Sequence, residues 1–146
     1  MKARIPKITV RNLQRKIRVD VANLEIFARR AVKLCLQVKV KKQMELQPLS
    51  EVLVLIVSDW KIATLHRKFM NTPGATDVIT FQHGEIFISA EMARRNARRF
   101  GTQMVRELRV YVVHGLLHLA GLDDDTPPGA RLMETIQRKI LAKAEL

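Results

Sequence analysis

The stretch MVRELRVYVVHGLLHLA, residues 104–120, decides the fold because it is apolar on nearly every side. A helix with this pattern has no face suited to water and belongs in the middle of a domain. The rest of the chain must therefore supply the elements that cover it. The same stretch carries His114 and His118 into that interior.

Strand and helix patterns alternate around this stretch. Runs rich in β-branched and aromatic residues predict strands, and apolar residues three and four apart predict helices. We expect strands at residues 8–12, 52–57, 76–81 and 85–89, helices at 20–38, 60–70 and 90–100, and a last helix from Thr126 and Pro127. Ser58 or Asp59 would cap the helix at 60–70, and Ser89 the helix at 90–100. His83 and Gly84 would turn a hairpin between the last two strands. The expected fold is α+β, a single domain over residues 1–146 with a mixed β-sheet packed with helices around the central His-bearing helix.

The overall charge indicates a polyanionic partner. The 146 residues include 26 Lys and Arg against 14 Asp and Glu, which gives a net charge of +12. Nucleic acid is the commonest partner of such a chain. An acidic membrane is the alternative, but no apolar run is long enough to span a bilayer and no basic helix carries aromatic residues along one edge. The lone Cys35 fits a small buried side chain in a reducing compartment, so we expect a cytoplasmic protein.

His114 and His118 are spaced to bind one metal ion. Positions i and i+4 share a helix face with Cβ atoms ~5–6 Å apart, so both rings could reach a zinc ion at ~2.0–2.1 Å. Gly121 can end the helix in the left-handed conformation and turn the chain back, which allows Asp123 or Asp124 to approach the same point. Two nitrogens, one carboxylate and an open fourth position are typical of a catalytic zinc site.

Ordinary packing is the alternative for these residues. A single His is more often a hydrogen-bonded core residue than a ligand, and three aspartates before Thr126 suit a loop and a helix cap. The combination favours a metal site, because two buried rings need partners that an apolar helix does not offer.

The spacing His-x3-His-x2-Gly-x2-Asp is that of the metzincin proteases, with one departure. Those proteases carry Glu directly after the first His, where this chain has Gly115. Glycine cannot deprotonate water, so we expect no peptide hydrolysis by that mechanism.

HGLLHLAG, residues 114–121, resembles instead the His-Gly-x-Leu-His-Leu-x-Gly pattern of the YbeY family, bacterial ribosomal RNA maturation factors that are single-domain, metal-dependent endoribonucleases. TDVITF (76–81) and GEIFIS (84–89) are similar to two further segments of that family and precede the His helix in the expected order. The resemblance implies metal ligands at His114, His118 and Asp124. At the position of Asp124 the family normally carries His. Asp123 would brace the loop, although geometry alone leaves either Asp as the third ligand.

The resemblance also implies an Arg beside the active cleft, where this chain has Met70. Candidate replacements are four arginines that form two i,i+4 pairs in ARRNARR, namely Arg94, Arg95, Arg98 and Arg99. An ordinary solvated face is the alternative, but no acid is interleaved among them. We expect contact with RNA phosphates, with an affinity that falls with salt and carries little base specificity. Lys39, Lys41 and Lys42, and Arg11, Arg15 and Lys16, could extend this surface.

Three further side chains have weaker patterns. Trp60 has helical spacing with core positions and is expected to be buried. Glu107 lies seven residues before His114 on roughly the same face, and could accept a hydrogen bond from an imidazole N–H. His83, in the hairpin turn, could face the cleft or the solvent.

The resemblance, the metal site and the charge together predict a zinc-dependent single-strand endoribonuclease that acts in small-subunit ribosomal RNA maturation and ribosome quality control. One zinc ion would polarise a phosphoryl oxygen and lower the pKa of its water toward ~7, while the residue that transfers protons is not assigned. Ribosomal RNA is the expected partner, with small-subunit ribosomal proteins and a GTPase as further candidates and no membrane. The alternatives are a zinc metalloprotease-like hydrolase and a non-catalytic ribosome assembly factor with a structural metal.

Overall fold

A four-stranded sheet lies at the centre of the computed structural model, which describes residues 5–38 and 49–145. The strands are β1 (Lys7–Asn12), β2 (Glu51–Val57), β3 (Val78–Phe81) and β4 (Glu85–Ser89), in the order β1-β2-β4-β3. The first three in this order are parallel, and β3 pairs antiparallel with β4 at the edge. The expected strands, the hairpin and the mixed sheet are therefore confirmed.

The helices are α1 (Val21–Cys35), α2 (Asp59–Met70), α3 (Ala90–Phe100), α4 (Met104–Leu119) and α5 (Pro127–Ala144). Three of them begin at the expected polar caps. The side chains of Ser58, Ser89 and Thr126 each accept a hydrogen bond from the backbone N–H three residues later. These bonds satisfy amide groups that the first turn of a helix leaves without a partner.

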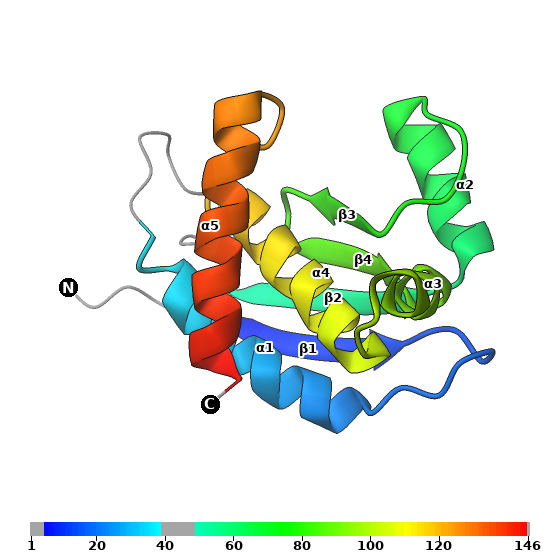
Figure 1. Ribbon diagram of the computed structural model, residues 1–146, viewed down its shortest axis with the longest axis horizontal. Helices are drawn as coiled ribbons and strands as arrows, with labels where there is room; N and C mark the ends of the chain where they lie inside the picture. The colour runs from blue at the N-terminus through cyan, green and yellow to red at the C-terminus, as the bar shows by residue number, and fades with distance from the viewer. Residues whose placement is uncertain (1–4, 39–48, 146) are drawn as a thin grey trace.

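The two faces of the sheet are covered unequally (Figure 1). On one face α1 and α4 pack against the sheet, α5 lies across both helices, and the apolar side chains form the larger core. On the other face α2 packs through Ile62 and Leu65 onto a smaller core. Half of the residues of α4 are buried and two, Val105 and Arg106, are exposed, so the central position of the His-bearing helix and the α+β fold are confirmed.

Helix α4 lies very close to the sheet at Gly115. A Cβ atom at this position would lie 2.6 Å from Cγ2 of Ile86 on β4, which is closer than side-chain carbons pack. The residue that follows His114 therefore faces the sheet and not the cleft. In the metzincin pattern this position carries the general base, and here it has no room for any side chain.

Trp60 is exposed, which makes the prediction of a buried ring wrong. Its exposed fraction is 76%, whereas Ile62, two residues later, is fully buried. Two residues on an α-helix are separated by ~200° around the axis, so a helix that buries Ile62 turns Trp60 outward. Cys35 is buried on α1 as expected, and burial raises the pKa of its thiol.

The basic connection between α1 and β2, with Lys39, Lys41 and Lys42, lies outside the described residues. Among the residues that are described, no helix is long and apolar enough to span a membrane.

Candidate metal centre

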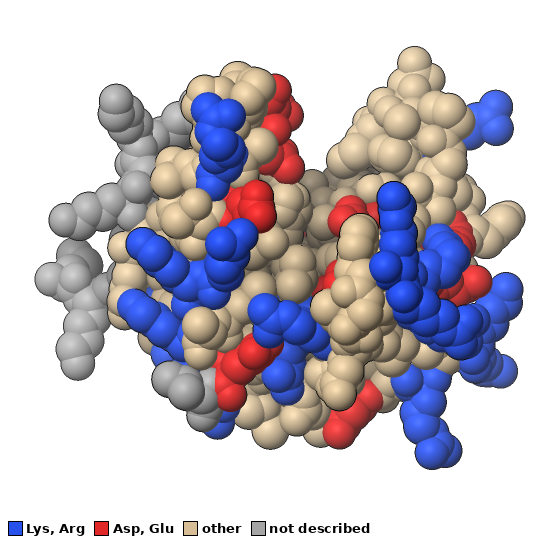
Figure 2. Space-filling model, in the orientation of Figure 1, with Lys and Arg blue, Asp and Glu red and all other residues tan. Residues whose placement is uncertain are grey.

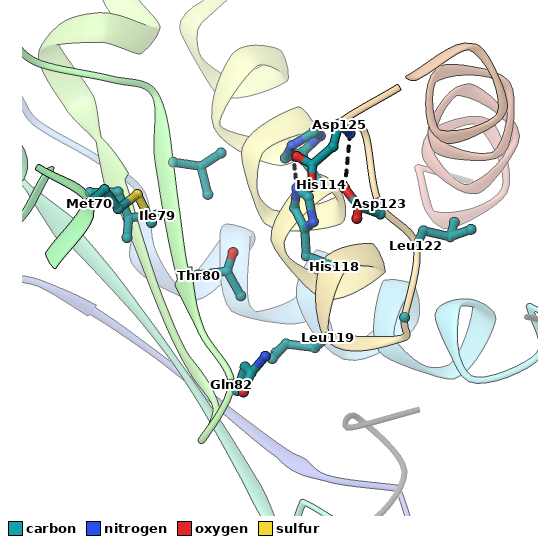
Figure 3. Close-up of a pocket in the computed structure, with 12 residues that line it drawn as sticks. Met70, Ile79, Thr80, Gln82, His114, His118, Leu119, Leu122, Asp123 and Asp125 are labelled. Carbon is teal, nitrogen blue, oxygen red and sulfur yellow. Dashed lines mark hydrogen bonds between the residues drawn. The ribbon is translucent and has the colours of Figure 1, made fainter. Parts of the chain in front are cut away.

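His114, His118 and Asp124 converge on one point at the end of α4. The Nε2 atoms of the two histidines lie 3.0 Å apart. Oδ2 of Asp124 is 3.5 Å from Nε2 of His114, and Oδ1 is 3.6 Å from Nε2 of His118. Figure 3 shows the two rings pointing toward each other from successive turns of the helix.

The turn after α4 brings the carboxylate to the histidines. Gly121 adopts a left-handed conformation with φ of 101°, which reverses the chain after the last helical turn. Leu122 is buried and its N–H donates to the carbonyl of Leu117, so the reversed chain is fixed to the helix. Asp123 accepts a hydrogen bond from the backbone N–H of Asp125 and stabilises the loop on either side of Asp124. The structure thus brings Asp124, and not Asp123, into the cluster with the two rings.

The second nitrogen of His114 is held by α5. Nδ1 of His114 lies 3.1 Å from Oε1 of Gln137. A carbonyl oxygen only accepts hydrogen bonds, so Nδ1 carries the proton and the lone pair of Nε2 points into the cluster. The prediction that Glu107 plays this part is wrong, because Glu107 instead accepts a hydrogen bond from the hydroxyl of Thr102. Sequence spacing along one helix could not find a partner on another helix.

The His118 ring is kept neutral by its surroundings. Burial lowers its pKa, the neighbouring His114 lowers it further, and Asp124 and Asp123 only partly oppose the shift. A neutral imidazole offers the lone pair that a metal ion requires.

The donor set fits a tetrahedral zinc ion. Ligand atoms at ~2.0–2.1 Å from zinc are separated by roughly 3.3 Å from one another in a tetrahedron. The two nitrogens lie 3.0 Å apart, and each has a carboxylate oxygen of Asp124 at 3.5 or 3.6 Å, so these separations lie close to this value. A cation would also relieve the contact between two imidazole lone pairs and a carboxylate oxygen.

A cleft of about 400 Å³ opens beside the cluster. The edge strand β3 and its turn form one wall through Val78, Thr80 and Gln82, and Met70 at the end of α2 borders the same space (Figure 3). The hydroxyl of Thr80 is buried and has no hydrogen-bond partner among the described residues. Buried hydroxyl groups normally have a partner, so Thr80 is an exception in the wall of the cleft.

The four predicted arginines do not line this cleft. They lie exposed on α3, where Figure 2 shows a gathering of Lys and Arg, whereas acidic side chains lie near the start of α5. Arg95 is paired with Asp59, and the guanidinium of Arg99 lies 5.3 Å from the ring centre of Phe100. Arg94 and Arg98 form no ion pair with any described residue, so they are the members of the set that are open to a phosphate. His83 is also outside the metal cleft, since it pairs with Glu85 at the exposed hairpin.

Known proteins are similar to this chain over most of its length, including the residues of the candidate metal centre. A sequence model described as endoribonuclease YbeY matches residues 9–145. The endoribonuclease YbeY of Bacteroides thetaiotaomicron is 36% identical over 101 residues, which cover 64% of this chain and 74% of that protein. The endoribonuclease YbeY of Thermobifida fusca is 34% identical over 116 residues, which cover 68% and 75% of the two chains.

A solved structure has the same fold. The solution structure of TM1509 from Thermotoga maritima superposes with a TM-score of 0.65 at 26% identity, covering 94% of this chain and 88% of the other.

Proposed function

Because this chain belongs to the endoribonuclease YbeY family, it is a nuclease that acts on RNA, and we propose that it is a zinc-dependent enzyme for maturation of small-subunit ribosomal RNA. The proposal includes cleavage of single-stranded regions, one zinc ion per chain held by His114, His118 and Asp124, and a cytoplasmic location. Small-subunit ribosomal proteins and a GTPase are proposed partners that would present the RNA.

The convergence of the three donor atoms is the observation that carries the proposal. Two neutral nitrogens and one carboxylate leave a fourth tetrahedral position, the arrangement of catalytic zinc sites. When bound there, the ion supplies Lewis acidity toward a phosphoryl oxygen and toward water. A carboxylate from Asp124 in place of a third imidazole would lower the charge of the centre by one unit and so would weaken the Lewis acidity that the ion supplies.

The residues of the chain then orient the substrate. Thr80 can donate a hydrogen bond to a phosphoryl oxygen in the cleft, and Met70 offers only apolar contact where a cation would be expected to neutralise the phosphate. Arg94 and Arg98 can hold the backbone of the RNA outside the cleft. The position after His114 faces β4, which argues against the protease alternative.

The test compares His118→Ala with His83→Ala, a matched loss of one imidazole at the exposed hairpin. Wild type and His83→Ala should each hold about one zinc per chain by elemental analysis and cleave a 16S-type ribosomal RNA transcript. His118→Ala should lose the zinc and lower the cleavage rate by at least about 100-fold.

Zinc bound with no RNA cleavage by rigorously purified wild type would leave only the assembly-factor alternative. Cleavage of casein by wild type and not by His118→Ala would favour the protease alternative. Equal RNA cleavage by the wild type and His118→Ala would exclude the proposed metal centre from the reaction.

A further inference from the structure

The exposed Trp60 ring has no part in the fold or in the metal cleft. It is the only tryptophan of the chain, and 76% of it is exposed on the outer face of α2. An aromatic ring of this size contributes most to stability or binding when it is buried. The position therefore leaves a large flat apolar surface available to a ligand.

Trp60 belongs to a groove with mixed chemistry. Trp60, Ala63, Thr64 and Arg67 share one face of α2 at the spacing i, i+3, i+4, i+7. Residues 73–74 of the following loop form the other side, and the groove has a volume of about 220 Å³. It offers a ring face, a small apolar floor and one guanidinium group.

The loop that closes this groove is fixed to the helix. Asn71 ends α2 in the left-handed conformation with φ of 51°, and its N–H donates to the carbonyl of Arg67. Nδ1 of His66 lies 3.0 Å from the carbonyl oxygen of Gly74. The groove is thus formed before any ligand binds.

Polar contacts join the start of α2 to α3. Asp59, adjacent to Trp60, accepts hydrogen bonds from Arg95 and from the hydroxyl of Ser89, and its backbone N–H donates to Glu91. Glu91 also lies 3.9 Å from Nζ of Lys16, so both acids near the groove already face a cation. The contacts neutralise local negative charge and join the start of α2, where Trp60 lies, to the helix that bears Arg94 and Arg98.

We infer that a single-stranded RNA segment binds across this face, with one base stacked on Trp60 and its phosphates beside Arg67, Arg94 and Arg98; this rests on the proposed function. Bases stack on aromatic rings without regard to sequence, and neighbouring cations hold the backbone. The excess of positive charge around a single ring favours RNA over a protein partner, because the core of a protein interface is depleted in charged residues. Met70 at the other end of α2 borders the metal cleft, so RNA bound here would be held close to that cleft.

The intrinsic fluorescence of Trp60 tests this directly, since no other tryptophan contributes. Metal-free full-length protein, which does not cleave, is titrated with a 12-nucleotide single-stranded oligoadenylate at low salt. We expect saturable quenching of the emission. Inorganic polyphosphate, which has charge and no bases, should bind without comparable quenching.

Variants separate stacking from apolar contact and from charge. The anisotropy of labelled oligoadenylate measures the affinity of each variant. The affinity of Trp60→Phe should lie within about threefold of the wild type, whereas Trp60→Ala and Trp60→Leu should bind about tenfold more weakly. Replacing Arg94 and Arg98 by Gln should reduce the slope of log affinity against log salt by about 1.4, or ~0.7 per phosphate contact. Circular dichroism and the melting temperature confirm that each variant is folded.

The outcomes distinguish this surface from the nuclease centre. Binding of oligoadenylate without quenching, or equal affinity of Trp60→Leu and Trp60→Phe, would overturn stacking on Trp60. Self-association that Trp60→Ala abolishes, with no RNA binding, would replace RNA by a protein partner. Quenching by oligoadenylate in a protein whose zinc-loaded form cuts no RNA would support this surface while the proposed cleavage fails.

Discussion

Gln137, a residue that binds no metal itself, controls how His114 can bind one. Its carbonyl oxygen fixes the proton on Nδ1 and so directs the lone pair of Nε2 to the ion. Gln137→Leu should weaken zinc binding about 10- to 100-fold, and Gln137→Glu, which keeps an acceptor, should bind at least as tightly as the wild type. Competition with a chromophoric chelator measures both. Similar affinities for the Leu and Glu variants would show that the contact does not orient the ligand.

Met70 places a neutral thioether at the border of the metal cleft, and 46% of it is exposed. A guanidinium group here could neutralise part of the charge on a bound phosphate. Met70→Arg should raise kcat/KM for RNA by about threefold or more, equivalent to ~0.7 kcal/mol. Met70→Leu, which adds no charge, serves as the control. If Leu and Arg give the same rate, this position does not contact the substrate phosphate.

The sequence predicted the convergence of His114, His118 and Asp124 better than it predicted the surroundings of these residues. The two histidines and Asp124 lie within one helix and its turn, so the local spacing determines their geometry. Gln137 approaches from a separate helix, and the packing of α5 on α4 decides that contact. The exposure of Trp60 was not predicted, because helical spacing alone does not say which side of α2 is buried. Ile62 and Leu65 define that side.

The helix α4 and the strand β4 are in close contact at Gly115 and Ile86. Alanine usually favours a helix, but here its methyl group would overlap Cγ2 of a fully buried Ile86. Gly115→Ala should therefore lower the free energy of unfolding by about 1–3 kcal/mol. Urea unfolding measures this, and the same substitution should cost less in an Ile86→Ala background, where the methyl group has room. Additive effects in that double-mutant cycle would show that the contact is not the cause.

The junction between α2 and α3 should depend on pH. Burial raises the pKa of Asp59, but hydrogen bonds from Arg95 and Ser89 outweigh it and hold the pKa below its usual value. The stabilisation is therefore complete above the unfolded-state pKa of ~3.9 and is lost as the pH falls through the lower folded-state value. Asp59→Asn should lower the free energy of unfolding by about 1 kcal/mol at pH 7, and this loss should shrink as the pH falls below ~3.9.

Glu134→Gln is the control for this pH dependence, because Glu134 and Arg138 form a pair that is largely exposed. The effect of Glu134→Gln on the free energy of unfolding should be near zero at every pH. A loss in Asp59→Asn that does not shrink as the pH falls would assign the effect to packing and not to charge.

The elements themselves were largely predictable. Strand patterns gave β1 to β4 within one or two residues, and Ser58, Ser89 and Thr126 marked helix starts because their side chains bond locally. The strand order β1-β2-β4-β3 was not predicted, since it depends on pairing between segments far apart in the chain.

The stability of the whole molecule should depend on the metal. An ion that binds the folded chain adds ~2.7 kcal/mol to the free energy of unfolding at a concentration 100 times its Kd. Zinc should thus raise the melting temperature by up to about 10 °C, and dipicolinate should reverse the rise. The shift should disappear in His118→Ala and persist in His83→Ala. An equal shift in both variants would mean that zinc binds elsewhere.

The two walls of the cleft come from separate pieces of chain. Residues 114–124 supply the proposed ligands, whereas residues 70–82 supply the opposite side. Selection can therefore act on one piece while the other stays constant, so preferences among RNA targets can diverge between relatives that share the same reaction. A chimaera that exchanges only residues 70–82 should inherit the target choice of its donor and the metal requirement of its host.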